Sequence, residues 1–207
     1  MSKLRTISAF KSSLAGGGAR PNLFEVSIPN FPFNLDWDDE NFSFLCKAAN
    51  LPASNISPID VPFRGRILKV AGDRVIDPWS VTVINDENFK LRTAFEQWAN
   101  QISKLDNNTG ATSPTSYMVD AYVNQLGRGA SSGKESTTNS DSSNDTTITP
   151  LRSYKFFDIF PTAIGQIDLS YDSSDTIEEY TVEFQVQYWS AGEGNQNNND
   201  QTNTTIR

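Results

Sequence analysis

The side chains that most often perform chemistry are scarce in this chain of 207 residues. Histidine is absent and cysteine occurs once, so the sequence offers neither an imidazole general base nor a Cys–His nucleophile pair. A zinc site, which draws its ligands mainly from these two residue types, cannot be assembled either. The single cysteine, Cys46, has no partner for an internal disulfide, and we predict that it is a small buried hydrophobe.

Carboxylates are the other candidate chemical groups, and they occur in two suggestive patterns. Asp172 and Asp175 are spaced for a possible glycosidase pair, but they lie in a D-S-S-D segment of the kind that forms turns. The acidic run over residues 36–40 invites a calcium interpretation, but it lacks the glycine and the distal glutamate of an EF-hand loop. We therefore interpret the run as a solvated loop and predict no catalytic residue, no metal site and no cofactor.

The negative charge is concentrated in the second half of the chain. Residues 1–105 hold 12 basic and 11 acidic side chains, whereas residues 106–207 hold 5 and 14, for a net charge of −8. Residues 166–189 contain six carboxylates and no cation, and such a surface repels nucleic acid. No apolar run approaches the roughly 18 residues of a membrane-spanning helix, and the first residues lack the apolar stretch of a signal peptide. We expect a protein that is made and kept in the cytoplasm.

The segment that organises the chain is residues 176–189. Its side chains alternate between an apolar and a polar face, which predicts one long β-strand. A slip by one residue would bury Glu179 and Glu183, so the register of this strand is well specified. The apolar face holds Tyr180, Val182, Phe184, Val186 and Tyr188, and the polar face holds Glu179, Thr181, Glu183, Gln185 and Gln187.

Similar patterns predict the remaining elements of the fold. One amphipathic helix is expected over residues 86–105, capped by Asn85 and Asp86, because its apolar residues recur at helical spacing. Further strands are expected at residues 24–28, 41–48, 76–86, 117–125 and 151–160, and a hairpin is expected to join residues 166–171 to the long strand. The predicted core comprises Phe24, Phe44, Trp79, Val81, Phe95, Trp98, Val182 and Phe184.

A proline-rich segment, residues 51–65, interrupts this series of strands. Its prolines at 52, 58 and 62 rule out a central strand and favour an extended arm or an edge. The chain then continues through R-I-L-K-V to a turn predicted at residues 71–74. The arm is too apolar for an ordinary loop and is predicted to be a surface that awaits a partner. The apolar residues of the arm are Ile56, Ile59, Val61 and Phe63.

Polar, low-complexity segments bound the predicted domain. Residues 1–20 form a basic, Ser- and Gly-rich arm that is expected to be flexible unless a partner orders it. Residues 128–149 are a polar insertion that cannot fold by itself, and residues 190–207 are an Asn-rich tail. The folded part is therefore a single mainly β domain over residues 21–189.

Four blocks of this sequence carry a resemblance to a known family. They are A-R-P-N-L-F at residues 19–24, F-L-C-K-A-A-N-L-P-A at 44–53, V-A-G-D-R-V-I-D-P-W-S-V-T-V-I-N-D-E at 70–87, and the stretch 164–189 that begins I-G-Q-I-D-L-S-Y. In this order they resemble the tail tube proteins of contractile-tailed bacteriophages. The resemblance implies a small β-barrel or sandwich with one flanking helix, which assembles into hexameric rings. It further implies that the rings stack into a hollow tube inside a contractile sheath, with baseplate and tube-terminator proteins as partners, and that DNA passes through the bore. Such a protein belongs to the virion, is assembled in the host cytoplasm and has no catalytic residues.

The residues themselves agree with a ring. Exposed strand edges are hazardous unless a neighbour closes them, and closure of a ring would leave a pore lined by a polar strand face. Glu179, Glu183, Gln185 and Gln187 are the predicted lining residues, and they would let a polyanion slide without sticking because no cation holds its phosphates. Stacking of rings is a second, head-to-tail contact, for which the arm at residues 51–65 is our candidate.

Two other interpretations remain open at this point. The inner tube of a phage-derived contractile injection particle would share the fold but carry a protein cargo. A carbohydrate-binding or adhesin β-sandwich belongs to a different class, and Trp37, Trp79 and the acidic loops could serve it.

Overall fold

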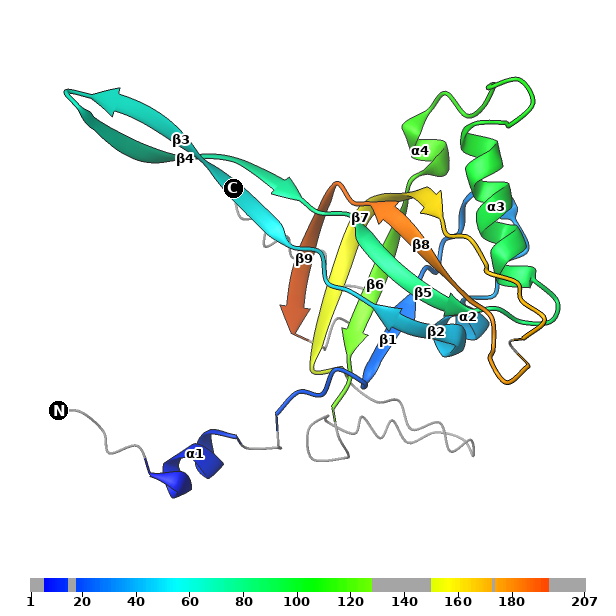
Figure 1. Cartoon of the computed structure of the whole chain (residues 1–207), viewed down its shortest axis with the longest axis horizontal. Coiled ribbons are helices and arrows are strands. Elements are labelled where there is room, and N and C mark those ends of the chain that lie inside the picture. Colours follow the sequence, from blue (N-terminus) through cyan, green and yellow to red (C-terminus); the bar gives the residue numbers. More distant parts are fainter. Residues whose placement is uncertain (1–5, 15–17, 128–149, 173, 194–207) are drawn as a thin grey trace, which may run out of the picture. The chain divides into compact units, whose positions relative to one another are not determined.

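The structure is a computed structural model of the whole chain (Figure 1). The predicted insertion at residues 128–149 lies outside the residues that the structure describes, as does the part of the predicted tail, residues 190–207, that follows residue 193. The described residues are 6–14, 18–127, 150–172 and 174–193.

The chain divides into two compact units, which are described separately. The smaller unit comprises Met1–Glu25, Val123–Tyr154 and Ala191–Arg207, and the larger comprises Val26–Tyr122 and Lys155–Ser190. The helices are α1 (Ile7–Ser13), α2 (Asp39–Leu45), α3 (Lys90–Ile102) and α4 (Pro114–Tyr117), with a 3-10 turn, η2, at Pro32–Asn34. The strands are β1 (Phe24–Ser27), β2 (Cys46–Ala49), β3 (Ser54–Phe63), β4 (Arg66–Ile76), β5 (Trp79–Ile84), β6 (Val119–Gln125), β7 (Arg152–Ile164), β8 (Glu179–Gln185) and β9 (Tyr188–Glu193).

In the smaller unit, main-chain and side-chain hydrogen bonds join segments that are distant in sequence. The amide of Leu126 donates to the carbonyl of Leu23 at 2.9 Å, and the amide of Leu151 donates to the carbonyl of Gln125 at 2.8 Å. Helix α1 lies within the arm predicted at residues 1–20, where the hydroxyl of Thr6 accepts a hydrogen bond from the amide of Ala9 at 3.3 Å. An N-cap of this kind satisfies one of the free amides of the first turn.

The strands form one large sheet and one separate hairpin. The sheet has the strand order β1-β6-β7-β8-β5-β2, and β9 also pairs with β7. Strands β3 and β4 pair only with each other in the described structure. The mainly β class is confirmed, but the sheet is open, since the outer strands β1 and β2 pair with β6 and β5 and not with each other in the described strand order.

The core of the larger unit depends on the antiparallel pairing of β5 with β8. Val81 lies opposite Val182 and Trp79 lies opposite Phe184, and all four side chains are fully buried. Alternate residues point to the other face, where the hydroxyls of Thr82 and Thr181 share a hydrogen bond at 3.3 Å. This alternation follows from the two-residue period of a β-strand.

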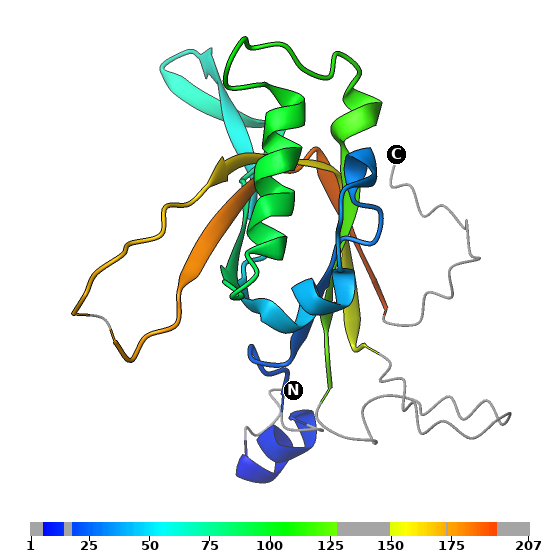
Figure 2. The same cartoon turned by 90° about the vertical axis from the view of Figure 1, so that its right-hand side faces the viewer.

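Helix α3 covers the buried face of this sheet (Figure 2). Phe95 and Trp98 are fully buried, and both rings lie 5.9 Å from the ring of Phe184. Trp37 packs edge-on against Phe95 with their ring centroids 5.3 Å apart. Such edge and tilted contacts add about 0.5–1.5 kcal/mol per pair to the hydrophobic burial, so this aromatic cluster joins the helix layer to the sheet.

The predicted strand at residues 41–48 is wrong in its first half. Residues 39–45 form helix α2, and the strand begins only at Cys46. Asp38 caps the helix, because its Oδ1 accepts a hydrogen bond from the amide of Asn41 at 3.1 Å. A helix separates positions two apart by about 200°, so Phe42 is buried whereas Phe44, which was predicted to be in the core, is 78% exposed. Phe24, also predicted for the core, is half-buried.

The amphipathic helix is confirmed but is shorter than predicted. It begins at Lys90, after Phe89 in a left-handed conformation with φ of 53°, and it ends at Ile102. Asn85 and Asp86, the predicted caps, do not cap the helix, because it begins only after Phe89 and has no side-chain cap. The backbone amide of Asn85 instead donates to the carbonyl of Glu178 at 2.9 Å and so extends the β5–β8 ladder. Leu105, the last residue of the predicted apolar stripe, lies beyond the helix and is exposed.

The long strand predicted at residues 176–189 is divided in two. Strands β8 and β9 both pair with β7, and they are separated by Val186 and Gln187. The amide of Gln187 still donates to the carbonyl of Phe157 at 3.3 Å. Beyond the break the alternation fails, since Tyr188 is exposed and stacks on Phe157 at 4.4 Å. The predicted hairpin strand at residues 166–171 is a loop instead.

The arm predicted at residues 51–65 is one half of a hairpin. Strand β3 pairs with β4, which runs straight through the turn predicted at residues 71–74. The turn lies instead at Arg64 and Gly65, whose φ values are 45° and 83°. Two positive φ angles are what a two-residue hairpin turn of the right twist requires, and glycine reaches them without strain.

The two phenylalanines of α2 provide a matched test of this fold. Phe42→Ala is expected to lower the free energy of unfolding by about 3–5 kcal/mol, because it leaves a cavity in the core. Phe44→Ala should change it by less than about 0.5 kcal/mol, because that ring is exposed. Urea denaturation of both variants measures the difference. Equal losses would contradict the helix, since only a strand places both rings on one buried face.

Candidate functional site

The acidic run at residues 36–40 makes contacts with neighbouring segments of the described structure. No group of three or more His, Cys, Asp or Glu residues there is placed to hold a metal ion. Asp39 accepts hydrogen bonds at 2.6 Å from the amide of Ile28 and the hydroxyl of Ser27, and Asp36 pairs with Lys90 at 3.2 Å. The acidic run at residues 36–40 therefore holds neighbouring segments together and is more than a solvated loop.

Three of the four predicted lining residues lie on the face of β8 that points away from the core. Glu179 and Glu183 are exposed and Gln185 is half-buried, while their neighbours along the strand are buried. Gln187 is exposed in the break between β8 and β9. The polar face continues onto β5, where Ser80 lies opposite Glu183.

One cation meets this polar face, which the charge pattern of residues 166–189 did not reveal. The ammonium group of Lys47, on β2, forms an ion pair and a hydrogen bond with the carboxylate of Glu179. Both side chains are about half exposed, with 55% and 46% of their area accessible, so the pair contributes at most about 1 kcal/mol. Glu183 has no ion pair within the described residues, which makes it the uncompensated carboxylate of this face.

A second polar cluster lies on β6 and β7, and the expected strands at residues 117–125 and 151–160 gave no sign of it because it depends on a contact between them. The ammonium group of Lys155 lies 2.8 Å from the carboxylate of Asp120 and 4.5 Å from the ring centroid of Phe157. Burial alone would lower the pKa of Lys155, but the hydrogen bond and the charge of Asp120 outweigh it and raise the pKa above 10.5. Lys155 therefore stays charged at neutral pH, held within the sheet.

The hairpin β3–β4 extends away from the sheet of the larger unit (Figure 1). Eight of its large apolar side chains are between 42% and 66% exposed, and such a concentration of exposed apolar residues typically marks an interaction surface. An isolated two-stranded hairpin is only marginally stable in water. These side chains include the predicted arm residues Ile56, Ile59, Val61 and Phe63, and Ile67, Leu68, Val70 and Val75 of the partner strand, which the sequence did not single out.

Comparisons with known proteins agree with this geometry. A family model described as phage tail tube protein matches residues 19–192. The tail tube protein gp19 of Enterobacteria phage T4 is 34% identical over 181 residues, which cover 87% of this chain and 94% of that protein.

Solved structures of contractile assemblies contain a similar fold. One is a chain in the sheath–tube complex of an extracellular contractile injection system, PVC, in its extended state, with a TM-score of 0.56 and 12% identity over 88% of this chain and 97% of that one. Another is a chain in the 6-fold symmetrised baseplate of the anti-feeding prophage, with a TM-score of 0.56 and 12% identity over 86% of this chain and 98% of that one.

Cys46 gives a test of the core beneath the polar face. Its side chain is buried, and burial raises the pKa of the thiol from 9.0 to about 12. At pH 8 the folded protein should therefore hold roughly a thousandfold less thiolate than the unfolded chain, and its alkylation by iodoacetamide should be correspondingly slow. Mass spectrometry before and after addition of urea measures the two rates.

The raised pKa of the Cys46 thiol also makes the stability of the fold depend on pH. Because the folded thiol keeps its proton while the unfolded thiol loses it above pH 9.0, the contribution of Cys46 to stability should decline as the pH rises through this range. Cys46→Ala should remove that part of the decline. Fast alkylation of the folded protein at pH 8 would contradict the burial of this thiol.

Proposed function

This chain belongs to the phage tail tube protein family, and from that premise we propose that it forms hexameric rings that stack into the inner tube of a contractile tail. The family members are structural components of the virion, and the chain has the corresponding structural role. The proposed tube lies inside a contractile sheath, ends at a baseplate and a terminator, and carries DNA through its bore. Assembly takes place in the host cytoplasm, and no step requires catalysis.

The hairpin β3–β4 is the observation that carries this proposal. Eight of its apolar side chains are exposed, so the hairpin leaves substantial apolar surface that only a partner can cover. The sheet adds two outer strands, β1 and β2, each of which pairs with a strand on one side only in the described structure. Unpaired edges favour association with further strands. Polymerisation of many copies of one chain would cover the apolar hairpin and provide partners for the strand edges.

The polar face of β8 supports the assignment of the bore. Glu179, Glu183 and Gln185 lie on the opposite face from the core, and the pairing of Glu179 with Lys47 reduces the local negative charge without leaving a free cation there. A wall of glutamine and paired or single carboxylates gives phosphates nothing to bind. We propose that these residues and Gln187 line the tube and let DNA pass with little friction.

The two other interpretations are weaker. Trp79 is fully buried and Trp37 is stacked on Phe31 at 4.1 Å, so neither indole is presented for stacking on a sugar. An injection particle with a protein cargo would share the fold, and the similar solved structures come from such assemblies. The sequence relatives, at 34% and 33% identity, are tail tube proteins of phages T4 and T6, and this favours the phage tail.

The hairpin can be removed where its base is already closed. The amide of Asp77 donates to the carbonyl of Ala53 at 3.0 Å, so residues 54–76 can be replaced by Asn-Gly, the preferred two-residue turn. The variant should keep the cooperative thermal unfolding of the wild type, because no residue of the hairpin is buried in the core, but form no tubes in negative-stain micrographs. Leu105→Ser, which removes an apolar side chain that is 95% exposed outside the hairpin, is the control and should form tubes. Tubes of normal yield from the deletion variant would remove the hairpin from assembly.

The bore can be tested by one reversal of charge. Glu183→Lys places an unpaired cation on the polar face and leaves the buried side chains of β8 unchanged, so tubes should assemble normally. Ejection of DNA from phage carrying this change should be slower at low salt and should recover as salt is raised, because added ions compete for the lysine–phosphate contacts. Asp106→Lys, an equal change at an exposed position outside β8, is the control. Ejection at the wild-type rate in low salt would place Glu183 outside the bore.

A further inference from the structure

The loop between β7 and β8 combines exposed apolar side chains with acidic side chains that form no ion pair in the described structure. We define the acidic loop as residues 166–172 and 174–178. Leu169, Tyr171 and Ile177 are each at least 75% exposed. The sequence from residue 166 to residue 178 contains four carboxylates and no lysine or arginine, and the described residues offer no ion pair to any of them. The carboxylates are Asp168, Asp172, Asp175 and Glu178.

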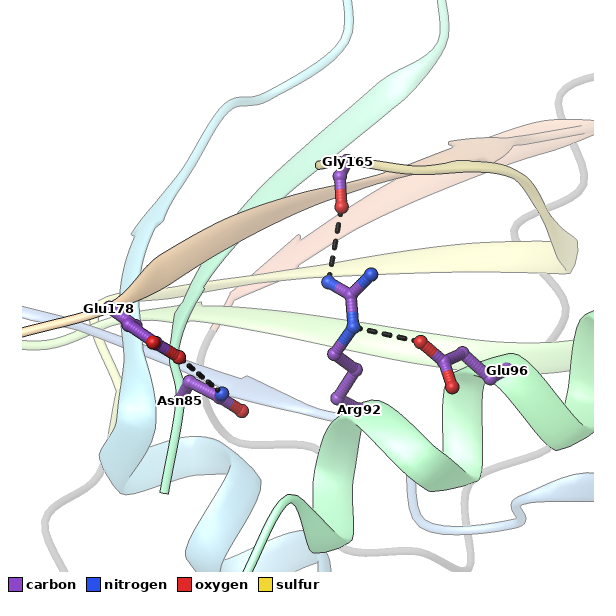
Figure 3. A network of polar contacts seen from close by, with 5 residues as sticks. All are labelled: Asn85, Arg92, Glu96, Gly165 and Glu178. Atoms are coloured by element: carbon purple, nitrogen blue, oxygen red, sulfur yellow. Dashed lines mark hydrogen bonds and ion pairs between the residues drawn. The ribbon is translucent and has the colours of Figure 1, made fainter. Parts of the chain in front are cut away.

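Both ends of the acidic loop are held in place (Figure 3). At the first end, Nη1 of Arg92 donates to the carbonyl of Gly165 at 3.1 Å, while its Nε pairs with Glu96 at 2.8 Å. At the second end, Nδ2 of Asn85 donates to the carboxylate of Glu178 at 3.1 Å. The loop is therefore presented from fixed points at the end of β5 and on α3, with its apolar side chains still exposed between them.

The hairpin carries the opposite charge. Residues 54–76 contain four basic and two acidic side chains, and Asp60 is already paired with Lys69 at 2.8 Å. Arg64 and Arg66 lie at the tip, next to the exposed ring of Phe63, and form no ion pair within the described residues. We define the hairpin tip as residues 61–68. It is apolar and cationic, whereas the acidic loop is apolar and anionic.

The register of β5 and β8 keeps the tip and the loop apart within one copy. The hairpin enters β5 at Trp79, which lies opposite Phe184, whereas the acidic loop ends at Glu179, which lies opposite Ile84. The two features are thus attached to opposite ends of the same strand pair, and the hairpin extends away from it (Figure 1). Two complementary surfaces at opposite ends of one molecule bind head to tail and produce an open filament.

We infer that the hairpin tip of one copy docks on the acidic loop of a second copy. Apolar side chains would be covered on both sides, and Arg64 and Arg66 would meet the carboxylates of Asp168, Asp172 and Asp175. This inference rests on the proposed function, to which it adds the surface that receives the hairpin. The complementary charge and the opposite attachment favour a second copy of this chain over another protein as the occupant.

Exchange of charge between the two surfaces tests the contact. The hairpin variant combines Arg64→Glu and Arg66→Glu, and the loop variant combines Asp168→Lys, Asp172→Lys and Asp175→Lys. Each variant alone presents like charges at the contact, so its tube mass, measured by sedimentation and negative-stain microscopy, should fall about tenfold or more below the wild type. Circular dichroism should be unchanged, because all these side chains lie on exposed loops or at the hairpin tip.

Restoration of assembly is the decisive measurement. An equimolar mixture of the two variants should form tubes again, because each negative tip finds a positive loop and each positive tip finds a negative loop. A single chain that carries all five changes should also form tubes by itself. Lys104→Glu and Asp106→Lys, at exposed positions beyond α3, are control substitutions and should leave tube formation at the wild-type level.

The outcomes separate this contact from the proposed function. Wild-type protein that forms no tubes, even from a baseplate nucleus, would overturn the proposed function itself. Normal tubes from either single variant would overturn the docking of the tip on the loop while leaving the tube intact. Loss of tubes in both variants without recovery in the mixture would also overturn it, because the two surfaces would then bind different partners.

Discussion

The pairing of β5 with β8 is the constraint on which the other features of this protein depend. Its register places Val81 against Val182 in the core and Thr82 against Thr181 on the outer face. Because side chains alternate with a period of two, a shift by one residue would bury the polar set and expose the apolar one. The same ladder separates the hairpin from the acidic loop. One register thus determines the core, the polar face and the two ends that we propose to meet between copies.

The second layer makes this register costly to change. Phe95 and Trp98 of α3 contact Phe184 directly, and Arg92 of the same helix lies 5.0 Å from the ring centroid of Tyr180 while it holds Gly165. A slipped strand would lose the aromatic contacts and the hydrogen bond together. The helix therefore contributes to the position of the acidic loop as well as to the core, since one face of it packs and one of its charged side chains reaches the loop.

The sequence predicts those parts of the structure that depend on residues close together in the chain, and it misses those that depend on contacts between distant residues. Long periodic segments were correctly identified, because Val182 and Phe184, or Phe95 and Trp98, repeat a pattern over many residues. The short run from Phe42 to Cys46 fits a strand and a helix equally well, and the capping by Asp38 decides for the helix. The partner strand of the hairpin, and the pairing of Lys47 with Glu179, depend on contacts between distant residues that no local pattern contains.

The division between a closed core and an open arm separates the stability of one copy from its assembly. The buried side chains lie outside the hairpin, whose residues contribute almost nothing to the core. Full burial of an aliphatic side chain is worth about 1.5–3 kcal/mol, so even partial coverage of the eight exposed apolar residues of the hairpin is comparable to the roughly 4–15 kcal/mol cost of association. For a single contact of this kind, the free energy gained by burial is therefore close to the free-energy cost of association. A ring or a growing tube offers several contacts to each incoming copy, so it is strongly favoured over an isolated pair.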